Sequence, residues 1–156
     1  MTTGRVRPET DRLLLDVMLG KLAVYLRVCG YDAAYALDRD IEDDDRLATV
    51  AEAESRRLLT RDAELGDRVP GAIPLCARGI EGQLAELRSA GVELVPDEKP
   101  SYCGNCNGRL DQVPPEADTP AYAPEPAAVE CFRCRDCGQL FWRGSHYDRM
   151  IETIKG

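Results

Sequence analysis

The amino-acid sequence predicts an α/β domain with a mostly parallel sheet and flanking helices, followed by a small zinc-binding module. Two observations predict this arrangement. Between residues 13 and 95, short apolar runs alternate with segments whose apolar residues recur every three or four positions, which is typical of buried strands alternating with amphipathic helices. After residue 100, five of the seven cysteines gather, and they include two C-x₂-C pairs.

The first half of the α/β region divides into three strands and two helices. A run of three leucines over residues 13–15 predicts a strand that ends at Asp16. A helical pattern over residues 19–26 follows, and Gly30 is expected to end that helix. Residues 31–37 predict a second strand. The acidic triplet at residues 43–45 predicts the start of the next helix, because carboxylates favour helix N-termini. Residues 57–60 predict a third strand, which ends at Arg61 and Asp62.

The second half continues this alternation and then changes character. Residues 72–76 and 92–95 predict two further strands, with a helix between them on which Ile80, Leu84 and Leu87 share a face. Residues 97–100 look like a linker, and the prolines between residues 114 and 126 predict a loop. We therefore expect a flexible polar tail over residues 1–12, an α/β domain over residues 13–97, and a zinc module over residues 101–150.

Composition limits the function classes. The formal net charge is −8, which weighs against binding to duplex nucleic acid through bulk electrostatics. The sequence has no run of 18 apolar residues, and its polar start does not resemble a signal peptide, so no membrane partner is expected. Seven cysteines without an export signal favour a reducing compartment, and we expect the protein to be cytoplasmic, with metal-bound thiolates.

The two C-x₂-C pairs predict one zinc ion held by Cys103, Cys106, Cys134 and Cys137. Each pair is followed by a glycine, which eases a tight turn, and four thiolates complete a closed tetrahedral shell of the structural kind. Cys131 offers an alternative, because it also stands three residues before Cys134. Disulfides or a redox pair are the competing interpretations, but neither pair has the strand–helix context of a redox motif.

A second metal site is suggested by carboxylates at the predicted ends of strands and helices. Asp16 and Asp62 each follow a strand, and the carboxyl ends of parallel strands share one edge of a sheet. Asp44, or its neighbour Asp43 or Asp45, begins the second helix. Acids that converge in one cleft need a cation such as Mg²⁺ or Mn²⁺. Taken singly, each of these acids is more often a cap or turn residue than a metal ligand.

Three motifs together resemble a known family. Residues 15–32 begin with Leu-Asp-Val-Met-Leu-Gly-Lys-Leu-Ala, residues 58–62 read Leu-Leu-Thr-Arg-Asp, and the two cysteine pairs are followed by Phe-Trp-Arg-Gly-Ser-His-Tyr at residues 141–147. In this order they resemble the Mut-seven C-terminal RNAse family, which is similar to PIN-domain ribonucleases and carries a zinc ribbon after the nuclease core. The resemblance runs from Leu13 to Met150.

The resemblance implies a PIN-like, metal-dependent ribonuclease in which Asp16, Asp44 and Asp62 hold one or two Mg²⁺ or Mn²⁺ ions that activate water. Glu64 and Asp67 are the only candidates for a fourth acid, so the number of ions stays open. The substrate RNA, endo or exo cleavage, the oligomeric state and a toxin role also stay open.

Basic and aromatic residues near these sites are candidates for RNA contacts. Lys21 and Arg61 flank the acids and could hold phosphates, although surface ion pairs would explain them equally. Arg143, Ser145 and His146 lie beside the zinc pairs and could contact unpaired RNA, whereas the neighbouring Trp142 is expected in the module's core. Because the chain is acidic, we expect any RNA partner to be single-stranded.

Two other functions compete with the ribonuclease. The chain could be a non-catalytic module that binds RNA or a protein partner. It could also transfer phosphoryl groups with Asp16 as the nucleophile, but the common pattern has a second Asp two residues later, where this sequence has Met18.

Overall fold

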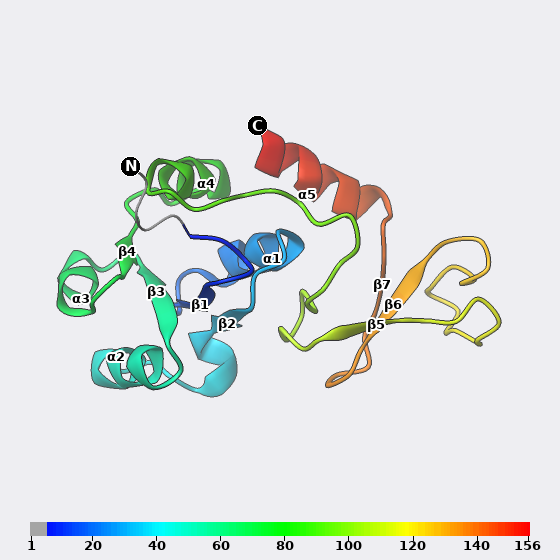
Figure 1. The fold of residues 1–156 in the computed structure, drawn as a ribbon, viewed down its shortest axis with the longest axis horizontal. Coiled ribbons are helices and arrows are strands. Elements are labelled where there is room, and N and C mark those ends of the chain that lie inside the picture. Colours follow the sequence, from blue (N-terminus) through cyan, green and yellow to red (C-terminus); the bar gives the residue numbers. More distant parts are fainter. Residues whose placement is uncertain (1–5) are drawn as a thin grey trace.

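The computed structural model describes residues 6–156, and within them the chain forms a parallel sheet, an antiparallel sheet and five α-helices (Figure 1). The parallel sheet has the order β2-β1-β3-β4. Its strands are β1 (Arg12–Leu15), β2 (Ala33–Tyr35), β3 (Arg56–Thr60) and β4 (Ile73–Pro74). The predicted α/β class, with a mostly parallel sheet followed by a small cysteine-bearing module, is confirmed.

Helices cover both faces of this sheet because successive strand residues point to opposite sides. Leu13 and Leu15 pack in a cluster with α1, α4 and α5, whereas Leu14 and Leu58 pack in a second cluster with α2 and α3. The helices are α1 (Gly20–Val28), α2 (Asp44–Ala53), α3 (Ala63–Arg68), α4 (Ile80–Ser89) and α5 (Ser145–Lys155), and a 3₁₀ helix, η1, covers Ala36–Arg39. The sheet is therefore buried on both sides, as its uninterrupted leucine run predicts.

The cysteine-bearing module is built on an antiparallel sheet of order β5-β6-β7, with β5 (Leu110–Gln112), β6 (Cys131–Cys134) and β7 (Leu140–Trp142). Its own core is small and centres on Val113, Cys131 and Leu140. A cluster of this size buries too little apolar surface to hold a fold alone, so the module depends on other links.

Helix α5 returns from the module to the α/β core. Its apolar side buries Met150, Ile151 and Ile154 in the same cluster as α1 and α4 (Figure 1). The zinc module was expected to extend to residue 150, but this helix packs on the α/β core. The chain thus crosses between the two parts twice, and the module is tethered at both ends.

Two further expectations are wrong in detail. Residues 92–95 do not join the parallel sheet, since Val92 forms only an isolated bridge, with Val6. The predicted tail is also too long, because Val6 is 1% exposed and β1 already begins at Arg12. The Tyr31 hydroxyl donates to the Val6 carbonyl at 2.9 Å and holds this segment on the core. The first five residues of the expected tail lie outside the described residues.

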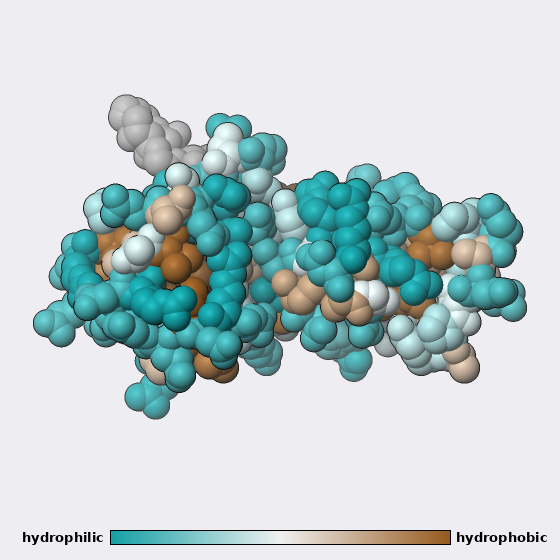
Figure 2. All heavy atoms as spheres, turned by 90° about the horizontal axis from the view of Figure 1, so that it is seen from below, coloured by the Kyte–Doolittle hydropathy of each residue, from teal (hydrophilic) through white to brown (hydrophobic). Residues whose placement is uncertain are grey.

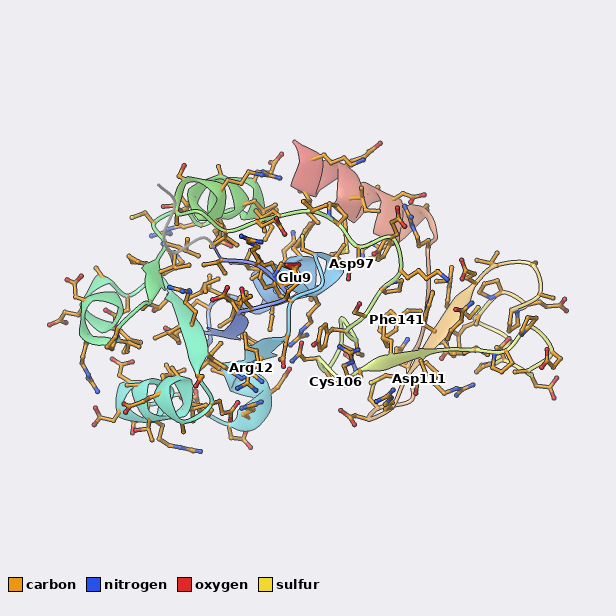
Figure 3. All side chains as sticks on the ribbon, in the orientation of Figure 1. Glu9, Arg12, Asp97, Cys106, Asp111 and Phe141 are labelled. Carbon is orange, nitrogen blue, oxygen red and sulfur yellow. The ribbon has the colours of Figure 1, made fainter. Side chains whose placement is uncertain are left out.

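The first cysteine turn docks on the outer edge of β2 (Figure 3, where Cys106 marks this turn). The Ala33 N–H donates to Asn107 Oδ1 at 2.9 Å, and Asn107 Nδ2 donates to Asp32 Oδ1 at 2.7 Å. Arg56 Nη1 donates to the same Asp32 oxygen at 2.8 Å. Arg27 adds a second link, from Nε to the Ala33 carbonyl at 3.0 Å and from Nη1 to the Gly104 carbonyl at 2.8 Å. Side chains thus satisfy the outward-facing N–H and carbonyl of an edge-strand residue, on the side where β2 has no neighbouring strand.

These contacts alter the ionisation of Asp32. Burial alone would raise the pKa of this carboxyl, but hydrogen bonds from Arg56 and Asn107 and the charge of Arg56 outweigh burial, so the pKa of Asp32 is lowered. Because the pKa of Asp32 is lower in the folded protein, this carboxyl stabilises the fold at pH values above its ordinary pKa. That contribution is lost as the pH falls through the lowered value.

We predict that Asn107→Asp lowers the free energy of unfolding by about 1–3 kcal/mol at neutral pH, because a donor to Asp32 becomes a second carboxylate. Asn105→Asp, on the same turn but without a bond to Asp32, is the control for added charge. Urea unfolding at neutral and acidic pH measures both, and the difference between the variants should shrink as the acids are protonated. Equal stabilities at neutral pH would contradict this account of the junction.

Candidate functional site

The carboxyl ends of β1 and β3 place two of the predicted acids at one edge of the sheet. Leu15 pairs in register with Leu59, so the next residues, Asp16 and Thr60, are neighbours on adjacent parallel strands. Asp16 is 9% exposed, and its main-chain N–H donates to the Leu59 carbonyl. This edge is where ligands gather in open parallel sheets.

Thr60 joins Asp16 to the segment that carries Asp62. Its fully buried hydroxyl donates to Asp16 Oδ2 at 2.7 Å and accepts from the Asp62 main-chain N–H at 3.0 Å. The Asp16 Oδ1 atom accepts from the Val17 N–H at 2.7 Å. Sequence reasoning missed this role of Thr60, and its only sequence signal is a hydroxyl between a buried strand and an acid.

Asp62 is exposed and begins α3. Its Oδ1 atom accepts from the N–H groups of Glu64 and Leu65, as an N-cap does. The position of Asp62 fits both a helix cap and a metal ligand, because the cap uses one carboxylate oxygen and leaves the other available.

The acidic triplet separates into three roles. Asp43 is the N-cap of α2 and accepts from the Asp45 N–H, while Asp45 forms an ion pair with Arg68. Asp44 is the first residue of α2 and is exposed, and no side-chain hydrogen bond or ion pair links it to the rest of the described chain. Of the three, Asp44 is thus the one whose carboxylate is not already used.

The three predicted acids do not form a close cluster. Within residues 6–156, the one group of three or more potential ligands whose atoms lie within 4.8 Å of one another is the set of four cysteines. The acids instead lie apart, because Asp62 caps α3 and Asp44 stands on another helix. Each retains oxygen lone pairs, which are the donors that Mg²⁺ and Mn²⁺ prefer.

Tyr35 and Asp38 are further groups near this edge. The Tyr35 hydroxyl donates to the Val17 carbonyl at 2.6 Å. Burial raises the pKa of Tyr35, and the negative charges of Asp38 and Asp16 raise it further. Gly20 allows this arrangement, because a Cβ there would come within 2.9 Å of the Tyr35 ring. Asp38 belongs to the acidic stretch before α2, and its negative charge acts on the same hydroxyl as that of Asp16.

The predicted RNA contacts fall into two groups. Lys21 is exposed in the first turn of α1, and Arg61 follows β3, so both lie on the side of the sheet that carries Asp16. Arg143, Ser145 and His146 lie at the start of α5, beside the cysteine module. The structure therefore separates Arg143, Ser145 and His146 from Lys21 and Arg61.

The four cysteines predicted as zinc ligands come together. The Sγ atoms of Cys103 and Cys137 are 3.6 Å apart, and those of Cys106 and Cys134 are 3.5 Å apart. Tetrahedral zinc with bonds of 2.3 Å requires sulfur–sulfur distances of roughly 3.8 Å. The cluster could therefore hold a zinc ion. Cys131 is not part of it, because its thiol faces the Val129 and Pro124 carbonyls.

Glycines allow the two turns around this cluster. Gly138 has φ +77, a conformation that side chains disfavour, and a Cβ on Gly108 would lie 2.7 Å from Cys134 Sγ. The two cysteines outside the module, Cys29 and Cys76, lie in apolar stretches of the sequence, which predicts that both are buried. Cys29 is buried, but Cys76 is exposed.

The surroundings of these thiols also shift their pKa values. Burial strongly raises the pKa of Cys103. At Cys137 burial acts in the same direction, but hydrogen bonds from the Gln139 N–H and the neighbouring thiols lower its pKa to about 7. A metal ion would replace these protons, so binding should weaken as the pH falls.

Comparison with known proteins agrees with the family resemblance. The family model described as the Mut7-C RNAse domain matches residues 11–154, nearly the whole chain. The chain belongs to this family. No match was found among curated proteins or among solved structures. Family membership therefore indicates a ribonuclease-type domain, while the site residues rest on the geometry above.

Within the described part of the chain, no helix is long and apolar enough to cross a bilayer. Figure 2 shows that hydrophilic residues cover most of the face seen there.

We predict that Thr60→Val destabilises the fold by about 1–3 kcal/mol, because it leaves the Asp16 carboxylate and the Asp62 N–H without their shared partner. Thr60→Ser keeps the hydroxyl and is the matched control, with a smaller loss from the missing methyl group. Urea unfolding measures both. A Thr60→Val protein as stable as Thr60→Ser would show that this hydroxyl does not hold the edge together.

Proposed function

We propose that the protein is a metal-dependent ribonuclease that hydrolyses phosphodiester bonds of single-stranded RNA. The observation that carries the proposal is the pairing of Asp16 and the Asp62 segment through Thr60, at the carboxyl edge of a sheet in a chain of the Mut7-C RNAse family. Membership supports an RNA substrate, and this edge supplies the oxygen donors that the chemistry needs.

Asp16, Asp44 and Asp62 would hold Mg²⁺ or Mn²⁺, which when bound lowers the pKa of a water and offsets charge on the scissile phosphate. The protein's part is to present these acids from rigid elements. Asp16 is fixed by Thr60 and by the Val17 N–H, and Asp62 is fixed at the start of α3. Lys21 and Arg61, on the same side, are proposed to bind RNA phosphates.

The second part of the proposal is a structural zinc ion held by Cys103, Cys106, Cys134 and Cys137. Four thiolates leave no open coordination position, so this ion would not take part in hydrolysis. Its effect would be to fix the turn that carries Asn107 against β2. Metal-bound thiolates require a reducing compartment, and this supports the expected cytoplasmic location.

The competing proposal is a non-catalytic module that binds RNA or a protein partner. The separation of the three acids favours it, whereas the position of Asp16 and Asp62 at the edge where ligands gather in open parallel sheets favours catalysis. The experiment below separates the two.

We predict that the wild-type protein cleaves a mixed, end-labelled RNA pool only when Mn²⁺ or Mg²⁺ is added. Asp16→Asn combined with Asp62→Asn should lower the cleavage rate at least about 100-fold, since the ligands for the metal are lost. Asp118→Asn, which removes an exposed acid in the proline-rich loop of the module, is the matched control and should retain activity.

Zinc content and circular dichroism of the same samples show whether each variant is folded. A folded double variant that cuts as fast as the wild type would refute the assigned residues. Inactivity of the wild type with both metals would favour the binding module.

We also predict that the purified protein contains about one zinc ion per chain. Cys106→Ser should lose that ion and unfold at a lower temperature, because binding of structural zinc contributes to the folding free energy. Cys131→Ser, which removes a buried thiol outside the cluster, should keep it. Elemental analysis measures both, and loss of zinc in Cys131→Ser alone would contradict the assignment.

A further inference from the structure

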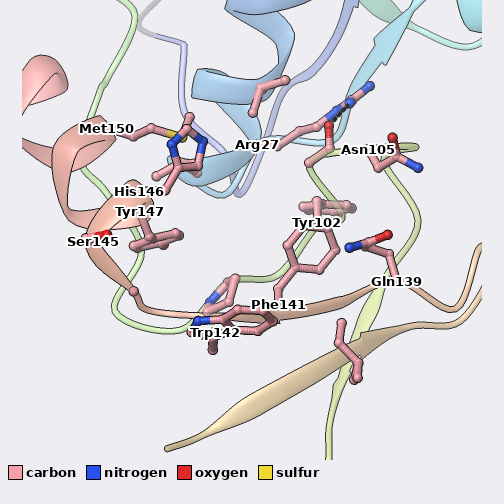
Figure 4. Close-up of a pocket in the computed structure, with 16 residues that line it drawn as sticks. Arg27, Tyr102, Asn105, Gln139, Phe141, Trp142, Ser145, His146, Tyr147 and Met150 are labelled. Carbon is pink, nitrogen blue, oxygen red and sulfur yellow. Dashed lines mark hydrogen bonds between the residues drawn. The ribbon is translucent and has the colours of Figure 1, made fainter. Parts of the chain in front are cut away.

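A cavity lies between the α/β core and the cysteine module, and none of Asp16, Asp44 and Asp62 lines it. It has a volume of about 530 Å³, which is within the range of roughly 300–1,000 Å³ that is usual for small-molecule sites. Helix α1, the first cysteine turn, β7 and the start of α5 all contribute to its wall (Figure 4).

Aromatic rings dominate this wall. Tyr102 and Phe141 face the middle of the cavity in Figure 4, with Trp142 below them and His146 and Tyr147 on the side of α5. Such rings offer flat surfaces on which a base can stack, and a single stacked base contributes substantially to affinity.

The charge of the cavity differs from that of the protein. Of the 28 acids in the sequence, none is among the residues found to line the cavity, and Arg27 is the one lining arginine or lysine in the described chain. Two more arginines lie against its tyrosines. The guanidinium of Arg143 is 5.4 Å from the centre of the Tyr147 ring, and that of Arg109 is 5.0 Å from the centre of the Tyr102 ring. An acid-free aromatic cavity with flanking cations suits an anionic ligand that carries a ring.

A second cavity lies beside the first, between β2 and the first cysteine turn. It has a volume of about 460 Å³, shares Asn105 with the first, and is lined by Tyr35 and Asp38 on the other side. The Tyr35 hydroxyl in turn contacts the carbonyl of Val17, the residue after Asp16. Both cavities thus lie along the seam between core and module, and the second one includes Tyr35, which contacts the carboxyl edge of the sheet.

We propose that the aromatic cavity binds an unpaired base of the RNA substrate, with its phosphates near Arg143 and Arg109, and thereby positions the strand along the seam. This inference rests on the proposed function for the identity of the ligand as RNA. Gln139, Asn105 and Ser145 supply hydrogen-bonding groups on the wall. A double helix presents its bases stacked and paired, so this pocket selects single-stranded segments.

The sequence provides its own probe of this site, because Trp142 is the only tryptophan in the chain and lines the cavity. Titration with oligouridylate, without added Mg²⁺ or Mn²⁺, should change the Trp142 fluorescence and saturate. An abasic oligonucleotide of the same length tests whether the base or the phosphates are bound. It should bind about 5- to 100-fold more weakly.

Variants locate the binding. Tyr102→Leu and Phe141→Leu remove rings from the wall and should weaken oligouridylate binding about 5- to 100-fold, whereas Tyr102→Phe keeps the ring and should bind nearly as the wild type does. Tyr122→Leu is the matched control. Tyr122 packs on Trp142 with ring centres 6.3 Å apart but does not line the cavity. Zinc content verifies that each variant is folded.

Three results would overturn the proposal: no saturable fluorescence change in the wild type, equal affinity for the abasic strand, or weaker binding in Tyr122→Leu than in Tyr102→Leu.

The binding test is independent of catalysis. The Asp16→Asn, Asp62→Asn protein should bind oligouridylate as the wild type does. If it binds but the wild type never cleaves RNA, the cavity stands and the nuclease proposal fails. If the wild type cleaves RNA but shows no fluorescence change, the nuclease proposal stands and the cavity proposal fails.

Discussion

The hydrogen bonds at Ala33 are the contact on which the arrangement of the two parts depends. Ala33 lies on β2, an edge strand whose outer N–H and carbonyl have no strand beside them. Asn107 of the cysteine turn and Arg27 of α1 satisfy these two groups. Because unpaired buried polar groups are costly, this edge favours the docked position of the module over a detached one. Both cavities of the seam exist only while that position is kept.

The cysteine cluster and this edge support each other. Arg27 is 3% exposed, and burial lowers its pKa, while the charges of Asp38, Cys103 and Cys106 act in the opposite direction. Thiolates bound to a metal would strengthen the attraction to this guanidinium. Helix α5 closes the arrangement from the other end by burying its apolar side on α1 and α4. In the proposed ribonuclease, zinc would therefore act on RNA binding through the shape of the seam.

Local patterns predicted much of the fold. The leucine run, the helical spacing of residues 19–26 and the acidic start of α2 depend on neighbours in sequence, and the structure contains the corresponding elements. The choice of Cys134 and Cys137 over Cys131 also followed from a local signal, the glycine after the second pair. Asp16 and Asp62 were placed at one edge because parallel strands align their carboxyl ends.

What the sequence did not predict depends on contacts between distant segments. Val6 pairs with Val92, and the side chain of Asn107 bonds to Ala33. The residues next to Val6 and Asn107 in the sequence give no sign of these distant contacts. The role of Thr60 needs the register of β1 against β3. The expected convergence of three acids assumed that helix starts lie beside strand ends, whereas Asp62 is oriented by its own cap and Asp44 stands on another helix.

The most direct test of the central claim is a crystal structure of the protein grown with Mn²⁺, with anomalous scattering used to separate manganese from zinc. The account predicts zinc at the four cysteines and manganese bound by Asp16 and Asp62 at the edge of the parallel sheet. Manganese absent from that edge, with the cysteine site filled and the fold intact, would contradict a metal-dependent nuclease centre there.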